Sequence, residues 1–352
     1  MKTGILTLPL HINYGGILQA YALQTTIENL GHEAELIVRD LPPGAMPWQK
    51  GLTLDEQLTI LQHTHRFIHQ YIKGEKNSLS KLTPDDYEAI VVGSDQIWRY
   101  YYTCHMPGGY ETVFLKFTEG WPLRRISYAP SFGVDEWEAP ADVTPAISRL
   151  LHNFYAVSVR ESSGVTLCRD ILGVEAQHVV DPTMLLTSKD YERLIDNSND
   201  TKAPEGDLMC YILDETPDKT ALIDTLAKRF GLRPFRANAK AEQPGAPLSE
   251  RVQAPVEQWL RSFRDAKMVI TDSFHATVFS ILFGKPFIVT GNPGRGLARL
   301  ESLLNQFGMT DHLVLDAADF NTDSDYSQPA SVPSLVSEKR QQSLEFLRKA
   351  FT

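Results

Sequence analysis

The sequence predicts an α/β protein with two domains, each built around a parallel sheet. Short apolar, β-rich segments alternate with helical segments along most of the chain, and a polar stretch divides this series into two halves. A length of 352 residues also accommodates two domains of ordinary size. We expect an N-terminal domain at 1–186, a linker at 187–206, a C-terminal domain at 207–335 and a final helix, 336–352, that packs back on the first domain.

The composition is that of a globular protein from a reducing compartment. Hydrophobic residues make up 42% of the chain and charged residues 22%. The formal net charge of −10 argues against general nucleic-acid binding, which requires a basic face. Cys104, Cys168 and Cys210 form no C-x-x-C pair and are odd in number, so the sequence indicates neither a zinc site nor a disulfide framework.

The sequence carries no targeting or membrane-spanning signal. Its start, MKTGILTLPL, lacks the long apolar core of a signal peptide. No window approaches the run of about 18 apolar residues that indicates a transmembrane helix. We therefore expect a cytoplasmic protein, with a peripheral contact at the inner face of the membrane left open. No oligomeric state is indicated.

The first domain is expected to begin with a βαβ unit. Gly4–Leu8 is typical of a strand, Ile17–Leu30 of a helix closed by Gly31, and Ala34–Val38 of a second strand. Between the first two lies a polar turn that contains Gly15 and Gly16. Glycines allow either a tight turn or the close approach of a ligand, and the sequence leaves both readings open. It does not contain G-x-G-x-x-G, so no dinucleotide is inferred.

A helix is expected at Leu54–Ile72 and carries three histidines. His63, His65 and His69 are spaced so that only the last two share a helix face, and no carboxylate is suitably placed beside them. A solvated helix face is favoured over a metal site. We expect no bound metal.

The segment YEAIVVGSDQIW is a candidate for function. Ala89–Val92 predicts a buried strand, and Ser94 and Asp95 lie in the turn at its carboxyl end. An aspartate at such a turn accepts hydrogen bonds from a sugar hydroxyl or serves as a base. The alternative is that Asp95 only caps the residues that follow it.

The close of the first domain is expected to supply a cation. Ile126–Ser131 and Ala156–Ser162 predict strands, and the second carries Arg160 and Glu161 near its end. Neighbouring residues on a strand point to opposite faces, so these two should not pair with each other. Arg160 is therefore the best candidate for a bidentate contact with a carboxylate or phosphate.

The second domain repeats the alternation of strands and helices. We expect strands and helices in turn at Asp207–Leu213, Thr220–Phe230, Arg233–Arg236 and Val256–Asp265. The final helix is expected at Val336–Phe351.

The most informative stretch is KMVITDSFHATVFSILFGKPFIVT. It predicts a strand at Met268–Thr271, a buried helix at Phe274–Phe283 and a strand at Phe287–Thr290, with Asp272 and Ser273 as N-cap residue types before the helix. The helix N-terminus should lie at the carboxyl edge of the sheet, where α/β folds bind ligands and backbone N–H groups favour anions. His275, in the first turn, is either a catalytic group or a buried core histidine.

Two arginines follow this stretch. Arg295 lies on a glycine-flanked loop, and Arg299 lies in the first turn of a helix expected at Leu297–Phe307. Either side chain could hold a phosphate beside the predicted site, or lie on the surface for solubility.

Four stretches resemble the polysaccharide pyruvyl transferase family. They are NYGGILQAYALQ, YEAIVVGSDQIW, VRES with the following VVDPTMLL, and TDSFHATVFSILFGKPFIV. The resemblance implies a GT-B-like architecture, in which two Rossmann-type domains with parallel sheets face one another across a cleft. It also implies transfer of the pyruvyl group of phosphoenolpyruvate onto two hydroxyls of a sugar. The product is a pyruvate ketal of an exopolysaccharide, capsule or cell-wall glycan, and phosphate is released.

The resemblance also implies roles for individual residues. His275 is the expected general acid and Asp95 a base or sugar ligand. The expected donor contacts are Arg160, Ser273, Phe274, Arg295 and Arg299, and the expected acceptor contacts are Asn13, Tyr14, Gly15, Gly16 and Ser94. Phosphoenolpyruvate is a co-substrate, and no cofactor is expected. The partner is a glycan acceptor, lipid-linked or not, and no nucleic acid is expected.

One position departs from the family pattern, and two other functions are open. Some family members carry Arg two residues before the histidine, where this chain has Ser273. A phosphate contact from that position is lost or is replaced by the hydroxyl and a backbone N–H. The alternatives to pyruvyl transfer are a GT-B glycosyltransferase with a nucleotide-sugar donor and a non-catalytic glycan-binding relative.

Overall fold

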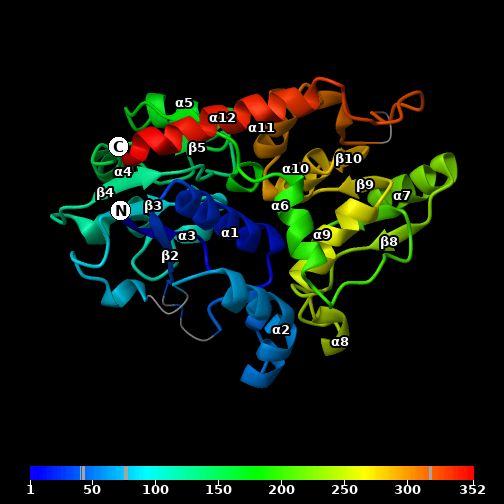
Figure 1. The fold of residues 1–352 in the computed structure, drawn as a ribbon, viewed down its shortest axis with the longest axis horizontal. Coiled ribbons are helices and arrows are strands. Elements are labelled where there is room, and N and C mark those ends of the chain that lie inside the picture. Colours follow the sequence, from blue (N-terminus) through cyan, green and yellow to red (C-terminus); the bar gives the residue numbers. More distant parts are fainter. Residues whose placement is uncertain (40, 42–43, 75–77, 317–318) are drawn as a thin grey trace. The chain divides into compact units, whose positions relative to one another are not determined.

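The computed structural model describes residues 1–39, 41, 44–74, 78–316 and 319–352. The chain forms two compact units (Figure 1). The first unit consists of 1–45, 68–185 and 337–352, and the second of 46–67 and 186–336. Both are α/β, with helices connecting parallel strands. Among the helices that the structure describes, none has the length and apolarity to cross a bilayer.

The first unit contains a four-stranded parallel sheet. Its strands are β1 (Lys2–Leu6), β2 (Glu33–Ile37), β3 (Ala89–Val92) and β4 (Arg124–Ser127). They are ordered β2-β1-β3-β4, so the direction of winding reverses between β1 and β3. In open α/β sheets, ligands bind beyond the carboxyl ends of the strands at such a reversal.

The helices of the first unit cover this sheet. They include α1 (Tyr14–Asn29), α3 (Tyr100–Thr103), α4 (Thr144–Leu151) and α5 (Ser162–Asp170), and a small parallel pair is formed by β5 (Ser158–Val159) and β6 (Gln177–His178). Helix α1 is buried over most of its length because its residues are apolar or small on nearly every face. Trp98 lies in the core between Phe114 and Phe132.

The last helix, α12 (Val332–Phe351), belongs to the first unit from Ser337 onward. The Ser343 hydroxyl accepts a hydrogen bond from the backbone N–H of Val180 (3.1 Å), and the Arg340 guanidinium donates to the carbonyl of Met184 (2.7 Å). The Phe351 ring stacks on His32. The C-terminal segment therefore completes a unit that begins at the N-terminus.

The second unit contains a five-stranded parallel sheet. Its strands are β7 (Leu208–Tyr211), β8 (Pro234–Arg236), β9 (Met268–Thr271), β10 (Phe287–Thr290) and β11 (Leu313–Val314), in the order β11-β10-β9-β7-β8. The winding reverses between β7 and β9, as it does between β1 and β3 in the first unit. Each sheet thus places one reversal at its carboxyl edge.

Helices α7 (Pro217–Phe230), α9 (Val256–Asp265), α10 (Phe274–Leu282) and α11 (Ala298–Gln306) connect these strands. The unit also contains α6 (Ser188–Asp196), α8 (Leu248–Arg251) and the part of α2 (Leu54–Tyr71) that precedes Ile68. Trp259, Phe263 and Phe279 form an aromatic cluster between α9 and α10, and Tyr191 of α6 packs edge-on against Phe279.

Two segments differ from the sequence-based expectation. Residues 187–206 were expected to be a linker, but they contain α6, because Tyr191, Leu194 and Ile195 form an apolar stripe and Thr187 with Asp190 forms a capping box. The strand expected at Ala156–Ser162 is only two residues long. Glu161 caps α5 instead, and the helix begins at Ser162.

Candidate active site

The most informative stretch of the sequence folds at the carboxyl edge of the second sheet. Strand β9 ends at Thr271, and Ser273 is the N-cap of α10, with its hydroxyl accepting from the N–H of Ala276 (3.5 Å). His275 lies in the first turn and is 6% exposed. The ring of Phe274 meets the His275 ring edge-on, with 5.4 Å between centroids. Ser273 is thus committed to the helix cap, and a ligand at this position would meet backbone N–H groups.

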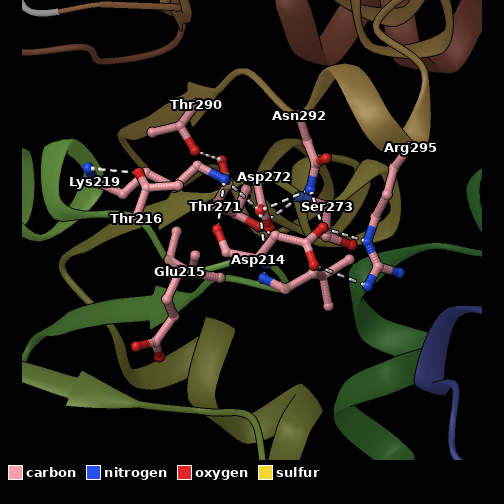
Figure 2. Close-up of polar contacts among 12 residues, drawn as sticks. Asp214, Glu215, Thr216, Lys219, Thr271, Asp272, Ser273, Thr290, Asn292 and Arg295 are labelled. Atoms are coloured by element: carbon pink, nitrogen blue, oxygen red, sulfur yellow. Dashed lines mark hydrogen bonds and ion pairs between the residues drawn. The ribbon is translucent and has the colours of Figure 1, made fainter. Parts of the chain in front are cut away.

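Asp272 is the centre of a polar network at this edge (Figure 2). Its buried carboxylate accepts from the backbone N–H groups of Leu213 (2.7 Å) and Asp214 (3.1 Å) and from the Asn292 amide (3.0 Å). It also accepts from the Lys219 ammonium (2.7 Å). These donors follow β7, β10 and the start of α7. Asp272 therefore fixes three connections around the winding reversal, in an arrangement typical of a preorganised site.

Arg295 extends this network. Its guanidinium pairs with Asp214 (Nε–Oδ2, 2.7 Å) and with Glu242 (Nη2–Oε2, 3.1 Å). The hydrogen bond from Arg295 lowers the pKa of Asp214. Arg299 donates to the backbone carbonyl of Arg295 (2.7 Å) and lies 5.8 Å from the ring of Phe274. Arg295 and Arg299 thus both lie near the His275 end of α10. The charge of Arg295 is already paired with two carboxylates.

The carboxyl edge of the first sheet carries the predicted acceptor residues. Asn13 caps α1, its side-chain oxygen accepting from the N–H of Gly16 (3.2 Å). The Gln19 amide donates to the Thr7 hydroxyl (2.9 Å), which donates to the carbonyl of Ser94 (3.0 Å). The turn after β1 is therefore tied to the turn after β3. Tyr14, Gly15 and Gly16 are buried in the first turn of α1.

Arg160 lies inside this unit, beside two aspartates. Its side chain is 1% exposed, Nη1 lies 2.8 Å from Oδ2 of Asp181, and Nη2 lies 3.7 Å from Oδ1 of Asp95. The Ser94 hydroxyl lies within hydrogen-bond distance of the same Asp181 oxygen (2.9 Å). The Glu161 carboxylate accepts from the N–H of Phe132 (2.7 Å). The expected contact of Arg160 with the donor stays a prediction.

Sequence reasoning missed most of the network in the second unit. Asp214, Lys219 and Asn292 were not singled out, and Asp272 was expected only to be a cap residue. A signal was present, because each follows or closely follows the end of a strand, where polar residues of parallel sheets converge. The predicted residues form two groups, one at each sheet edge, and their individual roles stay predictions. In the part of the chain that the structure describes, no group of three His, Cys, Asp or Glu side chains is placed to hold a metal ion.

The comparison with protein families decides which family this architecture represents. The family described as polysaccharide pyruvyl transferase matches residues 13–293, a range that includes both sheet edges. The chain belongs to the polysaccharide pyruvyl transferase family. Membership assigns it to the transferases and implies a glycan acceptor. No match is found among curated proteins.

Comparison with solved structures identifies the fold. Arabidopsis thaliana UGT89C1 complexed with UDP-L-rhamnose is similar over 99% of this chain and 93% of its own, at 13% identity and a TM-score of 0.50. The UDP-GlcNAc 2-epimerase from Neisseria meningitidis bound to UDP-GlcNAc covers 97% and 94%, at 10% identity and a TM-score of 0.44. At such identities the first likeness concerns the fold alone. It confirms a GT-B-like architecture of two Rossmann-type units with parallel sheets.

Proposed function

We propose that the protein transfers the pyruvyl group of phosphoenolpyruvate to two hydroxyls of a sugar, forming a cyclic ketal and releasing phosphate. The observation that carries this proposal is the placement of His275. In a member of the pyruvyl transferase family, the one ionisable side chain of a buried apolar helix lies in its first turn, beyond the end of β9. A general acid is required there if an enol phosphate binds at the helix N-terminus.

The reaction has definite needs for protons. His275 donates a proton to the methylene carbon of the donor, which leaves an oxocarbenium-like centre at the neighbouring carbon. A sugar hydroxyl attacks that centre and loses its proton to a base, for which Asp95 is our candidate. The carbon–oxygen bond to phosphate then breaks with its electron pair on phosphate, and the second hydroxyl closes the ring. Two hydroxyl protons are released in all: one restores His275 and the other leaves with phosphate.

Donor binding is supported by cations and dipoles in the second unit. Backbone N–H groups in the first turn of α10 and the arginines at 295 and 299 are suited to phosphate and carboxylate oxygens. A phosphate dianion beside His275 favours the protonated imidazolium, so the donor itself would help to charge the acid. Arg295 pairs with Asp214 and Glu242. The donor would have to compete with these carboxylates for it.

The test is phosphate release from phosphoenolpyruvate in the presence of a panel of glycans, with NMR detection of the ketal methyl group. We expect His275→Gln to lower kcat by about 10²- to 10⁴-fold, the range for loss of a general acid. His312→Gln is the matched control, because it alters another buried histidine of the same unit, one that bonds the carbonyl of Phe287. Turnover by His275→Gln at the wild-type rate would overturn the assignment. Consumption of a nucleotide sugar instead of phosphoenolpyruvate would establish the glycosyltransferase alternative.

A further inference from the structure

The turn after β3 is strained at a residue that carries a carboxylate. Asp95 has φ 69° and ψ −175°, a backbone conformation that essentially only glycine adopts without penalty. Ala129, which follows the neighbouring strand β4, also has a positive φ of 55°. Strain of this kind persists only where the surroundings over-determine it, and it clusters at functional sites.

Hydrogen bonds on both sides hold Asp95 in this conformation. The N–H of Ser131 donates to the carbonyl of Asp95 (2.9 Å), and the N–H of Trp98 donates to the carbonyl of Ser131 (3.2 Å). Gly93, two residues before Asp95, packs closely, since a Cβ there would lie 3.3 Å from Leu23 and 3.4 Å from Ile5. A glycine at position 95 would adopt the same backbone conformation and keep the same backbone hydrogen bonds without strain. It would lack the carboxylate.

The carboxylate of Asp95 has no hydrogen-bond donor in the described part of the chain. Its side chain is 8% exposed and forms an ion pair with Arg160, with 3.7 Å between Nη2 and Oδ1. That guanidinium is committed to Asp181 at 2.8 Å. A buried carboxylate without donors is costly, and the cost is relieved by a ligand that brings O–H groups.

The charge of this cluster selects the ligand. The cluster consists of Arg160, Asp95 and Asp181, and its formal charge is −1. This charge disfavours the phosphate and carboxylate of an anionic donor. Neutral hydroxyls, by contrast, donate to a carboxylate without adding charge. Its two oxygens can accept from two neighbouring hydroxyls at once.

We infer that the strained turn at Asp95 is the binding site for the hydroxyl pair of the acceptor sugar, with Arg160 as a positioning residue. The inference rests on the proposed function for the identity of the ligand as acceptor. Asp95 accepts both hydroxyl protons as hydrogen bonds and removes the first as that oxygen attacks. Arg160, locked by Asp181, holds the carboxylate in place without contacting the sugar.

The first experiment measures the strain independently of any ligand. The melting temperatures of Asp95→Gly and Asp95→Asn are compared, because both remove the charge while only glycine relaxes the backbone. We expect Asp95→Gly to melt about 2–4 °C or more above Asp95→Asn. Ala129→Gly is the matched control, and it should also melt above wild type. A melting temperature for Asp95→Gly at or below that of Asp95→Asn would overturn the inference.

The second experiment measures sugar binding by saturation-transfer NMR. The probes are methyl β-D-galactopyranoside and methyl α-D-mannopyranoside, each of which presents neighbouring hydroxyls. We expect transfer to at least one probe in wild type, Ala129→Gly and His312→Gln, and its loss in both Asp95 variants. No transfer in wild type, or undiminished transfer in Asp95→Asn, would contradict the inference. Because no donor is present, failure here is distinguishable from failure of the proposed reaction, which phosphate release reports separately.

Discussion

Asp272 and Asp95 hold corresponding places in the two units but have opposite surroundings. Each follows the strand on the far side of the winding reversal, β9 in the second unit and β3 in the first. Asp272 accepts four hydrogen bonds from protein donors (Figure 2), and neither Asp272 nor the residues that donate them have a positive φ. The Asp95 carboxylate accepts none from the described residues, and the residue lies in a strained turn. An aspartate at this position of the sheet can therefore either hold the surrounding loops in place or leave its carboxylate available to a ligand.

The difference separates the two chemical tasks. A saturated carboxylate such as Asp272 no longer competes for substrate, so it can position Lys219 and Asn292 while the helix N-terminus faces an anion. An unsaturated carboxylate such as Asp95 is suited to accept protons. The donor would then belong to the second unit and the acceptor hydroxyls to the first.

The largest effect expected from this comparison is on stability, at Asp272. Asp272→Ala removes the partner of Lys219, whose side chain is only 11% exposed, and leaves two backbone N–H groups without an acceptor. We expect a loss of about 3–5 kcal/mol in the free energy of unfolding, as for a broken buried ion pair. Urea unfolding measures it. Glu242→Gln, at the exposed end of the same network, is the control and should cost less than about 1 kcal/mol. Equal losses would show that Asp272 is not the hub.

The second prediction tests the same contrast inside the first unit. Asp181→Ala removes the carboxylate that lies 2.8 Å from the buried Arg160 guanidinium, and it also removes the acceptor for the Thr183 hydroxyl (2.7 Å). We expect a loss of about 3 kcal/mol or more. Asp95→Ala removes a carboxylate without hydrogen bonds and should cost less than about 1 kcal/mol. Urea unfolding of the two variants decides between them, and a larger cost for Asp95→Ala would mean that Asp95 is structural.

A smaller effect, of opposite sign, is expected at the start of α1. Gly16 is helical, and a Cβ there would meet only the side chain of Asn13 at 3.6 Å, an ordinary contact. Gly16→Ala should therefore raise the free energy of unfolding by about 0.5–1 kcal/mol. If the glycine leaves room for the acceptor, the same variant should raise the acceptor KM. A stabilised variant with unchanged kinetics would remove Gly16 from the site.

The weakest effect is the pH dependence of unfolding. His178 in the first unit and His312 in the second each donate a ring N–H to a backbone carbonyl, and burial is the main cause that lowers the pKa of both. Below the ordinary value of 6.5 the unfolded chain binds more protons than the folded chain, so stability falls as pH decreases through that value. His312→Gln should flatten this slope in urea titrations between pH 7 and 5, taken as about the range over which a histidine titrates. An unchanged slope in both His312→Gln and His178→Gln would contradict the assignment.

Much of the fold was predictable because short-range signals determine it. Ala89–Val92, Met268–Thr271 and Phe287–Thr290 are continuous apolar runs bounded by turn residues, and they form strands with the predicted bounds. The Ser273 cap and the buried helix after it were also predictable from the sequence. Helix α6 was missed because its apolar stripe is narrow within a polar segment.

The partners of the site residues could not be read in the same way. Lys219 lies 53 residues from Asp272 and Asn292 lies 20 residues from it, and only the strand order brings them together. Arg160 was predicted to contact a ligand because Glu161 was not expected to pair with it, and the sequence did not show that Asp181, 21 residues further on, binds its guanidinium. Residues distant in sequence therefore determine that Asp272 accepts hydrogen bonds from protein donors and that the Asp95 carboxylate does not. The strain at Asp95 is likewise imposed by the neighbouring strand.

We propose that the sheet edge of the second unit binds the donor and that of the first unit binds the acceptor. Donor binding to matched variants tests this assignment most directly. Phosphoenolpyruvate is titrated into wild type, Arg295→Ala and Asp95→Asn while the melting temperature is followed, since a ligand that binds only the native state raises it. The account predicts a saturable rise in wild type and in Asp95→Asn, and a strongly weakened rise in Arg295→Ala. No rise in wild type, or a rise lost in Asp95→Asn and kept in Arg295→Ala, would contradict it.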